Sequence, residues 1–173
     1  DDLEALSTSS RRQIDRDAAP VLKAVGVGRK GVLEPSDLEV FDGEVVGIAG
    51  LLGSGRTELV RMLYGADRPD GGRFEIDGKV VRIANPRNAI DNRIAFSSEN
   101  RREEGIIGDL TVAENIVLGI QARRGWLRKV PHGEQVAIVN DYIAALNVRP
   151  ADPNRAVRNL SGGNQQKVLL ARW

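Results

Sequence analysis

Two glycine-rich segments of this chain have the composition of loops that bind phosphate. The first reads GLLGSGRT, from Gly50 to Thr57, and the second reads LSGGNQQ, from Leu160 to Gln166. Glycine lets a backbone turn tightly and bring its N–H groups close to an anion, and a helix that follows adds partial positive charge. The first segment therefore has the features of a triphosphate site, and the second can bind an anion.

The first segment fits the pattern of a phosphate-binding loop except that Arg56 stands where lysine is usual. Arginine keeps the positive charge but is planar and bulkier, so we expect nucleotide binding to persist in weakened form and hydrolysis to suffer more. The apolar run Val45–Ala49 predicts a strand buried on both faces before the loop. The alternative is a glycine turn without a ligand.

The candidate nucleotide-binding residues are consecutive, and the hydroxyl of Thr57 is the candidate ligand for Mg²⁺. They are Gly50, Leu51, Leu52, Gly53, Ser54, Gly55, Arg56, Thr57 and Glu58. A helix is expected to follow this loop and to end near Gly65, with one apolar face formed by Leu59, Met62 and Leu63.

The second segment reads locally as the start of a helix with Ser161 as its candidate cap. Gly162 and Gly163 give close access to the backbone, and an anion can bind at such a helix start. The alternative is a plain helix cap, which Ser-Gly-Gly alone favours.

Strand signals lie on both sides of the first loop. Val21–Val27 predicts an edge strand, and Ile94–Phe96 predicts a second strand buried on both faces. Asp77-Gly78 between two short β-rich runs predicts a hairpin. The remaining strand candidate is Leu38–Val40.

Helix signals dominate the second half of the chain. Asn85-Pro86 predicts a capped helix start, and Thr111 with Glu114 predicts a capping box. A further amphipathic helix is expected over Glu134–Asn147, with four residues directed inward: Val136, Val139, Ile143 and Leu146. The order of these elements suggests an α/β core with a helical insertion.

Composition excludes several classes of protein. In 173 residues, 25 basic side chains nearly cancel 24 acidic ones, so the basic excess typical of nucleic-acid binding is missing. There is no cysteine, which excludes disulfides and thiolate metal sites. No apolar stretch approaches the ~20 residues of a spanning helix. The acidic first residues do not match a secretory signal.

The segment LSGGNQQKVLLARW resembles the signature motif and following helix of ABC-transporter ATPases. In that family the signature of one domain closes on a nucleotide held by another. Gly43-Glu44 and GLLGSGRTELVRMLYG resemble the second ATPase domain of bacterial sugar importers of the ribose, galactose, xylose and arabinose type. Arginine often replaces the loop lysine there, so Arg56 fits the group.

The resemblance also implies roles for residues outside the phosphate loop. SSENRREEG, from Ser97 to Gly105, resembles the Q-loop segment of the same group, in which Glu99 would sense Mg²⁺ and the permease. Taken alone, this run is more typical of an exposed polar loop. The implied signature residues, facing nucleotide on another domain, are Leu160, Ser161, Gly162, Gly163, Asn164 and Gln165.

The fold that this resemblance implies is α/β, a P-loop NTPase core of the ABC type with an antiparallel β subdomain and a helical subdomain. It places the Walker B strand, with its aspartate and the catalytic glutamate, beyond Trp173. The expected divisions are a linker at 1–20, an ATP-binding core at 21–108, a helical subdomain at 109–160 and a signature helix at 161–173.

The implied function is the ATP-binding subunit of an ABC-type sugar importer, an ATPase that uses ATP and Mg²⁺ and couples hydrolysis to carbohydrate uptake. Its expected partners are the first nucleotide-binding domain of the same polypeptide and membrane permease subunits, with no contact to sugar or nucleic acid. The expected location is the cytoplasmic face of the bacterial inner membrane. These 173 residues alone are expected to bind nucleotide weakly without hydrolysing it.

Three hypotheses follow from these residues. The first is that the signature serves a productive composite site while the Arg56 site is weak. The second is a regulatory ATP-binding module without turnover. The third is a soluble ABC ATPase outside transport.

Overall fold

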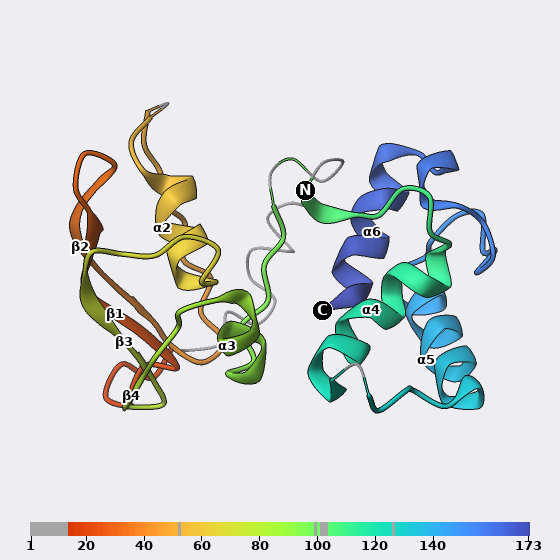
Figure 1. Ribbon diagram of the computed structural model, residues 1–173, viewed down its shortest axis with the longest axis horizontal. Helices are drawn as coiled ribbons and strands as arrows, with labels where there is room; N and C mark the ends of the chain where they lie inside the picture. The colour runs from red at the N-terminus through yellow and green to blue at the C-terminus, as the bar shows by residue number, and fades with distance from the viewer. Residues whose placement is uncertain (1–13, 52, 99, 101–103, 126) are drawn as a thin grey trace, which may run out of the picture. The chain divides into compact units, whose positions relative to one another are not determined.

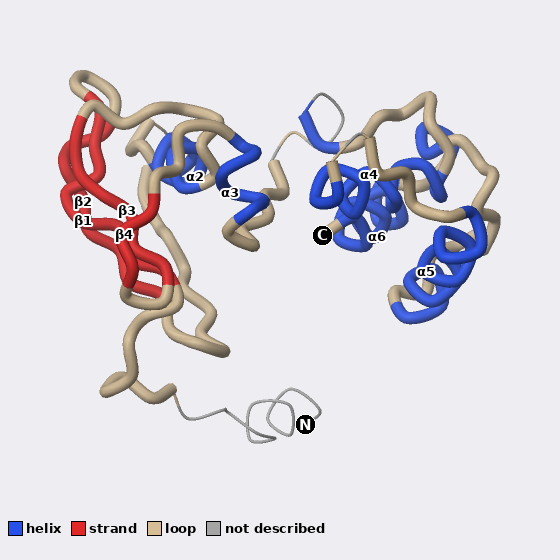
Figure 2. Tube along the Cα trace, turned by 60° about the horizontal axis from the view of Figure 1, so that its bottom comes forward, coloured by secondary structure: helices blue, strands red, loops and turns tan. Residues whose placement is uncertain are grey.

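Alternating and β-branched runs in the first half of the chain form a four-stranded antiparallel sheet in this computed structural model. The structure describes residues 14–51, 53–98, 100, 104–125 and 127–173. The strand order is β2-β1-β3-β4, and Figures 1 and 2 show the strands side by side. Their bounds are β1 (Leu22–Arg29), β2 (Leu33–Val40), β3 (Gly71–Ile76) and β4 (Lys79–Val81).

The first strand is not an edge strand as predicted, because β1 pairs on both sides. Leu22 lies opposite Val40 of β2 and opposite Ile76 of β3. Alternation of apolar and polar residues shows which face of a strand is buried, but it does not show how many strands pair with it. The prediction was wrong because β1 also pairs with β3, which lies far along the chain. The hairpin prediction is confirmed, since β3 and β4 pair around Asp77 and Gly78, both of which have positive φ.

Two short helices belong to the same unit as the sheet, residues 1–92, and both lie to one side of it (Figure 2). Helix α2 (Arg56–Leu63) buries the predicted face of Leu59, Met62 and Leu63. Helix α3 (Pro86–Asp91) begins as predicted, with the Asn85 side chain accepting a hydrogen bond from the N–H of Asn88 at 3.0 Å. The sequence thus placed both helices correctly by their local signals.

The two predicted buried strands do not form among the described residues. Val45 is 95% exposed and Leu51 is 86% exposed, and residues 43–51 belong to no strand. Ile94–Phe96 likewise lies outside the sheet. A strand buried on both faces needs hydrogen-bonded neighbours and covering layers, and neither run pairs with any of the four described strands.

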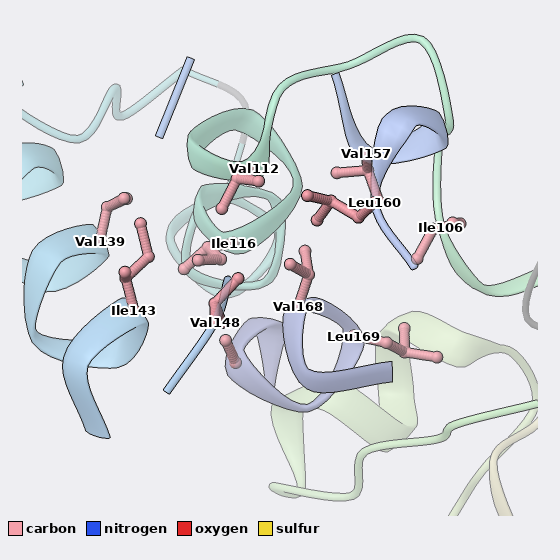
Figure 3. Packing of buried hydrophobic residues seen from close by; sticks show 11 residues of the cluster. Ile106, Val112, Ile116, Val139, Ile143, Val148, Val157, Leu160, Val168 and Leu169 are labelled. Atoms are coloured by element: carbon pink, nitrogen blue, oxygen red, sulfur yellow. The ribbon is translucent and has the colours of Figure 1, made fainter. Parts of the chain in front are cut away.

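Residues 93–173 form a second unit with a helical core. Its helices are α4 (Val112–Arg124), α5 (His132–Ala145) and α6 (Gly162–Arg172), and a 3₁₀ turn, η2 (Val157–Asn159), precedes α6. The predicted capping box opens α4. Figure 3 shows the buried cluster, which comprises Ile106, Val112, Ile116, Val139, Ile143, Val148, Val157, Leu160, Val168, Leu169 and Ala171.

One inward residue of α5 was predicted wrongly. Val139 and Ile143 are buried and Leu146 packs partly against the cluster, but Val136 is 45% exposed. Val136 lies one turn before Val139, closer to the start of α5. In the described part of the chain, none of the helices is both long and apolar enough to cross a bilayer.

Candidate functional site

The glycine-rich loop before α2 turns through two residues in the left-handed region. Gly53 has φ 78° and Gly55 has φ 83°. The N–H of Ser54 donates to the carbonyl of Leu51 at 3.1 Å, which closes the turn. Only glycine adopts this region without strain, so the loop conformation requires glycine at positions 53 and 55.

Gly55 also lies against the turn between β1 and β2. A Cβ at this position would lie 2.7 Å from Cδ1 of Leu33 and 3.2 Å from the carbonyl oxygen of Val32. The sheet therefore holds the loop from one side, and it fixes where α2 begins. Because Gly55 is the N-cap of α2, the same contact sets the direction of the first N–H groups of that helix.

The start of α2 has the properties of an anion site. No side chain caps this helix among the described residues, and Arg56 and Thr57 are exposed in its first turn. Unsatisfied N–H groups and the helix dipole favour negative charge there, and the Arg56 guanidinium adds a full positive charge. The residues present therefore fit a phosphate chain, and the exposed Thr57 hydroxyl is compatible with a metal bound beside it.

A hollow of about 360 Å³, which no motif in the sequence predicts, lies at the turn between β1 and β2. Leu33, which touches the Gly55 position, lines the hollow together with Arg29, Lys30 and Asp70. The N–H of Lys30 donates to a carboxylate oxygen of Asp70 at 2.9 Å, which joins two segments 40 residues apart. No local sequence signal shows such a pairing.

The second loop opens α6, with Ser161 as the N-cap residue by position but without a side-chain capping bond. Its hydroxyl oxygen instead accepts a hydrogen bond from Nδ2 of Asn164 at 2.9 Å. The Oδ1 atom of Asn164 accepts from the backbone N–H of Arg149 at 2.8 Å. The Asn164 amide therefore orients the Ser161 side chain, while Ser161 and Gly163 remain exposed.

Leu160 and Gln165, the first and last of the six predicted signature residues, are buried. The Nε2 atom of Gln165 donates to the carbonyls of Val157 and Leu160, at 3.3 and 3.2 Å. Its Oε1 atom has no hydrogen-bond partner among the described residues. These two residues hold the loop on the core, and the four residues between them are exposed or half-buried.

Glu99 and Leu52 lie outside the described residues. Ser98, directly before Glu99, is buried, and its hydroxyl has no partner among the described residues. In the described part of the chain, no His, Cys, Asp or Glu side chains cluster as a metal site would require. The two loops belong to different units, 1–92 and 93–173.

Comparisons with known proteins place the chain among ABC transporter proteins. The sequence profile described as "ABC transporter" matches residues 33–173. The fructose import ATP-binding protein FruK of Bifidobacterium longum is 57% identical over 164 residues, which cover 95% of this chain and 32% of that protein. The galactofuranose transporter ATP-binding protein YtfR of Escherichia coli K12 is 46% identical over 154 residues, covering 89% of this chain and 31% of that protein.

A third relative is the ribose import ATP-binding protein RbsA of Bacillus subtilis, 40% identical over 144 residues, covering 83% of this chain and 29% of that protein. Among solved structures, MJ1267, described as an ATP-binding cassette of an ABC transporter, superposes with a TM-score of 0.70 at 23% identity over 88% of this chain and 64% of that one. CbiO1 of Clostridium perfringens gives 0.68 at 19% identity, covering 88% and 60%. The chain thus spans about a third of the length of the curated relatives it matches.

Proposed function

Because this chain belongs to the ABC transporter family, we propose that it is the second nucleotide-binding domain of a sugar importer's ATP-binding subunit. That subunit couples binding and hydrolysis of ATP to carbohydrate uptake. The names of three relatives, which are import proteins for fructose, galactofuranose and ribose, support the proposal.

The observation that carries this proposal is the start of α2, which follows two left-handed glycines and has no side-chain cap among the described residues. Its backbone N–H groups would hold the phosphate chain, and Arg56 would balance part of the negative charge. The Thr57 hydroxyl would hold Mg²⁺. When bound, ATP supplies the phosphoanhydride bond whose hydrolysis by water drives the cycle.

The second loop, residues 160–165, is the signature loop, and it has a different role in this proposal. Ser161 is exposed and held by Asn164, so its hydroxyl is positioned for a phosphate that another domain binds. Gly163 leaves its surroundings open, since a Cβ there would meet nothing within 4 Å. The proposed partner is the first nucleotide-binding domain of the same polypeptide, and permease subunits would hold both domains at the cytoplasmic face of the inner membrane.

The test uses the full-length polypeptide with its permease, in a strain that lacks the native subunit. The wild-type protein is expected to bind MgATP and to restore sugar uptake. Ser161→Ala is expected to lower uptake about tenfold or more, because a positioned donor to a phosphate is lost. Arg56→Ala is expected to cost less, since its own site is the weaker one in this proposal.

Two control variants, one of a serine and one of an arginine outside the two loops, separate loss of a binding group from loss of folded protein. Ser36→Ala removes a hydroxyl that donates to the carbonyl of Glu34 within β2, and Arg87→Ala removes an exposed arginine of α3. Both are expected to retain uptake. A larger loss for Arg56→Ala than for Ser161→Ala would contradict the composite site. ATP binding without turnover would favour a regulatory module, and turnover independent of a permease would favour an ATPase outside transport.

A further inference from the structure

Three arginines line a hollow in the sheet unit that is separate from both glycine-rich loops. The hollow measures about 270 Å³, and it is formed by β3, by the end of β4 and by the residues before and after this hairpin. Its cations are Arg68, Arg73 and Arg82, and the described residues that line it include no aspartate or glutamate. This arginine hollow therefore has the charge of a site for an anion.

The charges around the arginine hollow differ from those around the hollow at the turn between β1 and β2. Arg29 and Lys30 line that other hollow, but Glu34 and Asp70 line it as well, so its charges balance. Both hollows belong to the unit formed by residues 1–92. An excess of positive charge is thus a property of the hollow beside β3 and β4, and it is not shared by the larger one.

Arg82 is the cation of this hollow that has no competing partner in the described part of the chain. Its side chain is exposed just after β4, and it forms no hydrogen bond or ion pair with a described residue. A guanidinium carries five N–H donors in a planar fork and no acceptor. All the donors of Arg82 are therefore open to water or to a ligand.

Arg68 is held against the opposite wall of the hollow. Its Nε atom donates to the carbonyl of Ala84 at 3.3 Å, and both residues line the hollow. The N–H of Ala84 donates in turn to Oδ1 of Asn88 in α3 at 3.2 Å. The chain after β4 is thus fixed from two sides, and it holds the Arg68 guanidinium at the hollow by a single nitrogen.

The acidic side chains nearest in sequence to these arginines neutralise only part of their charge. The Nε atom of Arg73 pairs with a carboxylate oxygen of Glu75 at 2.7 Å. Asp67, which precedes Arg68, pairs with Arg61 of α2 at 2.8 Å. One carboxylate thus faces three guanidiniums, which leaves two positive charges at the arginine hollow.

We propose that Arg68, Arg73 and Arg82 form a binding site for the phosphate group of a small phosphate monoester. At neutral pH such a group carries close to two negative charges, which match the two unbalanced positive ones. Guanidinium forks bind phosphate oxygens in pairs, so arginine suits this ligand better than lysine does.

The size and the lining of the hollow define the rest of the ligand. Sites for drug-sized ligands measure about 300–1,000 Å³, so a hollow of about 270 Å³ fits a molecule smaller than a nucleotide. Pro69, Val81 and Ile83 also line it, and they would contact the carbon atoms of the ester. None of the lining residues belongs to the loop at 50–57, so the site is distinct from the one proposed for ATP.

The test uses the full-length polypeptide, saturated with Mg²⁺ and a non-hydrolysable ATP analogue so that the phosphate loops are occupied. Glycerol 3-phosphate is the probe, and glycerol is its neutral counterpart. Calorimetric titration is expected to show binding of the ester but not of glycerol. Absence of ester binding by the wild-type protein would overturn the inference.

Arg68→Gln and Arg82→Gln are each expected to weaken ester binding about tenfold, the usual effect of losing a hydrogen bond to a charged group. Arg82→Lys keeps the charge without the fork and is expected to give an intermediate affinity. Arg87→Gln is the matched control, because Arg87 is an exposed arginine of the same unit that pairs with Asp91 and does not line the hollow. Equal weakening by Arg87→Gln would show a general effect of charge and overturn the inference.

A phosphate monoester can also be presented by a lipid, and vesicles distinguish the two sources. Phosphatidylcholine vesicles with and without phosphatidic acid are mixed with the same protein. Binding to the phosphatidic acid vesicles without binding of free glycerol 3-phosphate would overturn the assignment to a small soluble ligand. Failure to bind the ATP analogue would instead count against the proposed function, and the arginine variants would still report on this hollow, because they lie outside the phosphate loop.

Chemical modification of the wild-type protein gives a second measurement that needs no variant. Phenylglyoxal modifies exposed arginines, and mass spectrometry locates the modified residues. Glycerol 3-phosphate is expected to slow modification of Arg68 and Arg82 at least about threefold, in proportion to the occupied fraction of the site, and to leave Arg87 unchanged. Equal rates with and without the ester at Arg68 and Arg82 would overturn the inference.

Discussion

Asn164 donates a hydrogen bond from Nδ2 to the hydroxyl oxygen of Ser161 at 2.9 Å. Because this oxygen accepts, the proton of Ser161 is left for another acceptor. The other end of the amide accepts from the N–H of Arg149 at 2.8 Å, so the side chain cannot turn over without losing both bonds. Asn164 therefore sets the direction in which Ser161 can donate.

Replacing Asn164 by aspartate tests this directly. The carboxylate still accepts from Arg149, but it has no N–H to offer, and it would accept the Ser161 proton instead. We expect permease-dependent ATP hydrolysis by the full-length protein to fall about tenfold. Asn159→Asp adds the same charge at an exposed position of η2 and should retain activity. Equal activity of Asn164→Asp and the wild type would contradict the role given to Asn164.

Alanine at Gly55 is expected to lower the free energy of unfolding by about 1–3 kcal/mol, from left-handed strain and from the clash with Leu33. Gly53→Ala has a similar φ but no neighbour within 4 Å, so it should show the strain alone. Gly47→Ala meets open space and should change little. Urea unfolding of the three variants separates the two effects, and equal losses for Gly47 and Gly55 would contradict the loop geometry. ATP affinity is expected to fall most in Gly55→Ala.

The capping box of α4 predicts a pH dependence. Hydrogen bonds from the N–H and then the hydroxyl of Thr111 lower the pKa of Glu114 below its ordinary value of 4.5. A carboxylate whose pKa is lower in the folded state stabilises above the unfolded pKa, and the effect is lost as the pH falls through the folded pKa.

Glu114→Gln should accordingly lower the free energy of unfolding by about 0.5–1 kcal/mol at pH 7, the usual range for an exposed cap. This difference from the wild type is expected to shrink as the pH falls below 4.5. Urea unfolding at pH 7 and pH 3 checks it. A difference that grew towards low pH would contradict the sign of the effect.

Gln165 offers a test of the buried face of the signature loop. Gln165→Glu would place a carboxylate beside the carbonyls of Val157 and Leu160, which repel it, and we expect a loss of about 3 kcal/mol or more at pH 8. Gln165→Met gives up two long hydrogen bonds and is expected to cost about 1 kcal/mol. Chemical denaturation compares the two, and a milder effect for glutamate than for methionine would contradict the burial of this side chain.

Local signals in the sequence predicted local structure well. The hairpin at Asp77-Gly78 and the cap at Asn85 depend on residues within a few positions of one another, and the structure confirms them. The buried strand expected at Val45–Ala49 depended on neighbours that no short pattern reveals. The interior place of β1 likewise depends on β3, which lies far along the chain.

The candidate site divides in the same way. The glycine-rich loops and Ser161 could be found by motif, because their chemistry lies in consecutive residues. The bonds that orient them could not, since Asn164 reaches Arg149 across 15 positions. Side-chain polarity in the sequence does not show which of several distant groups will be the partner.

The exposed apolar run Val45–Ala49 affects how the chain can be handled at high concentration. Val45, Val46 and Ile48 present β-branched side chains to water outside any described strand. An uncovered stretch of this kind is a template on which copies can associate through intermolecular β-pairing. Keeping the chain soluble at high concentration therefore depends on supplying that stretch with a strand to pair with.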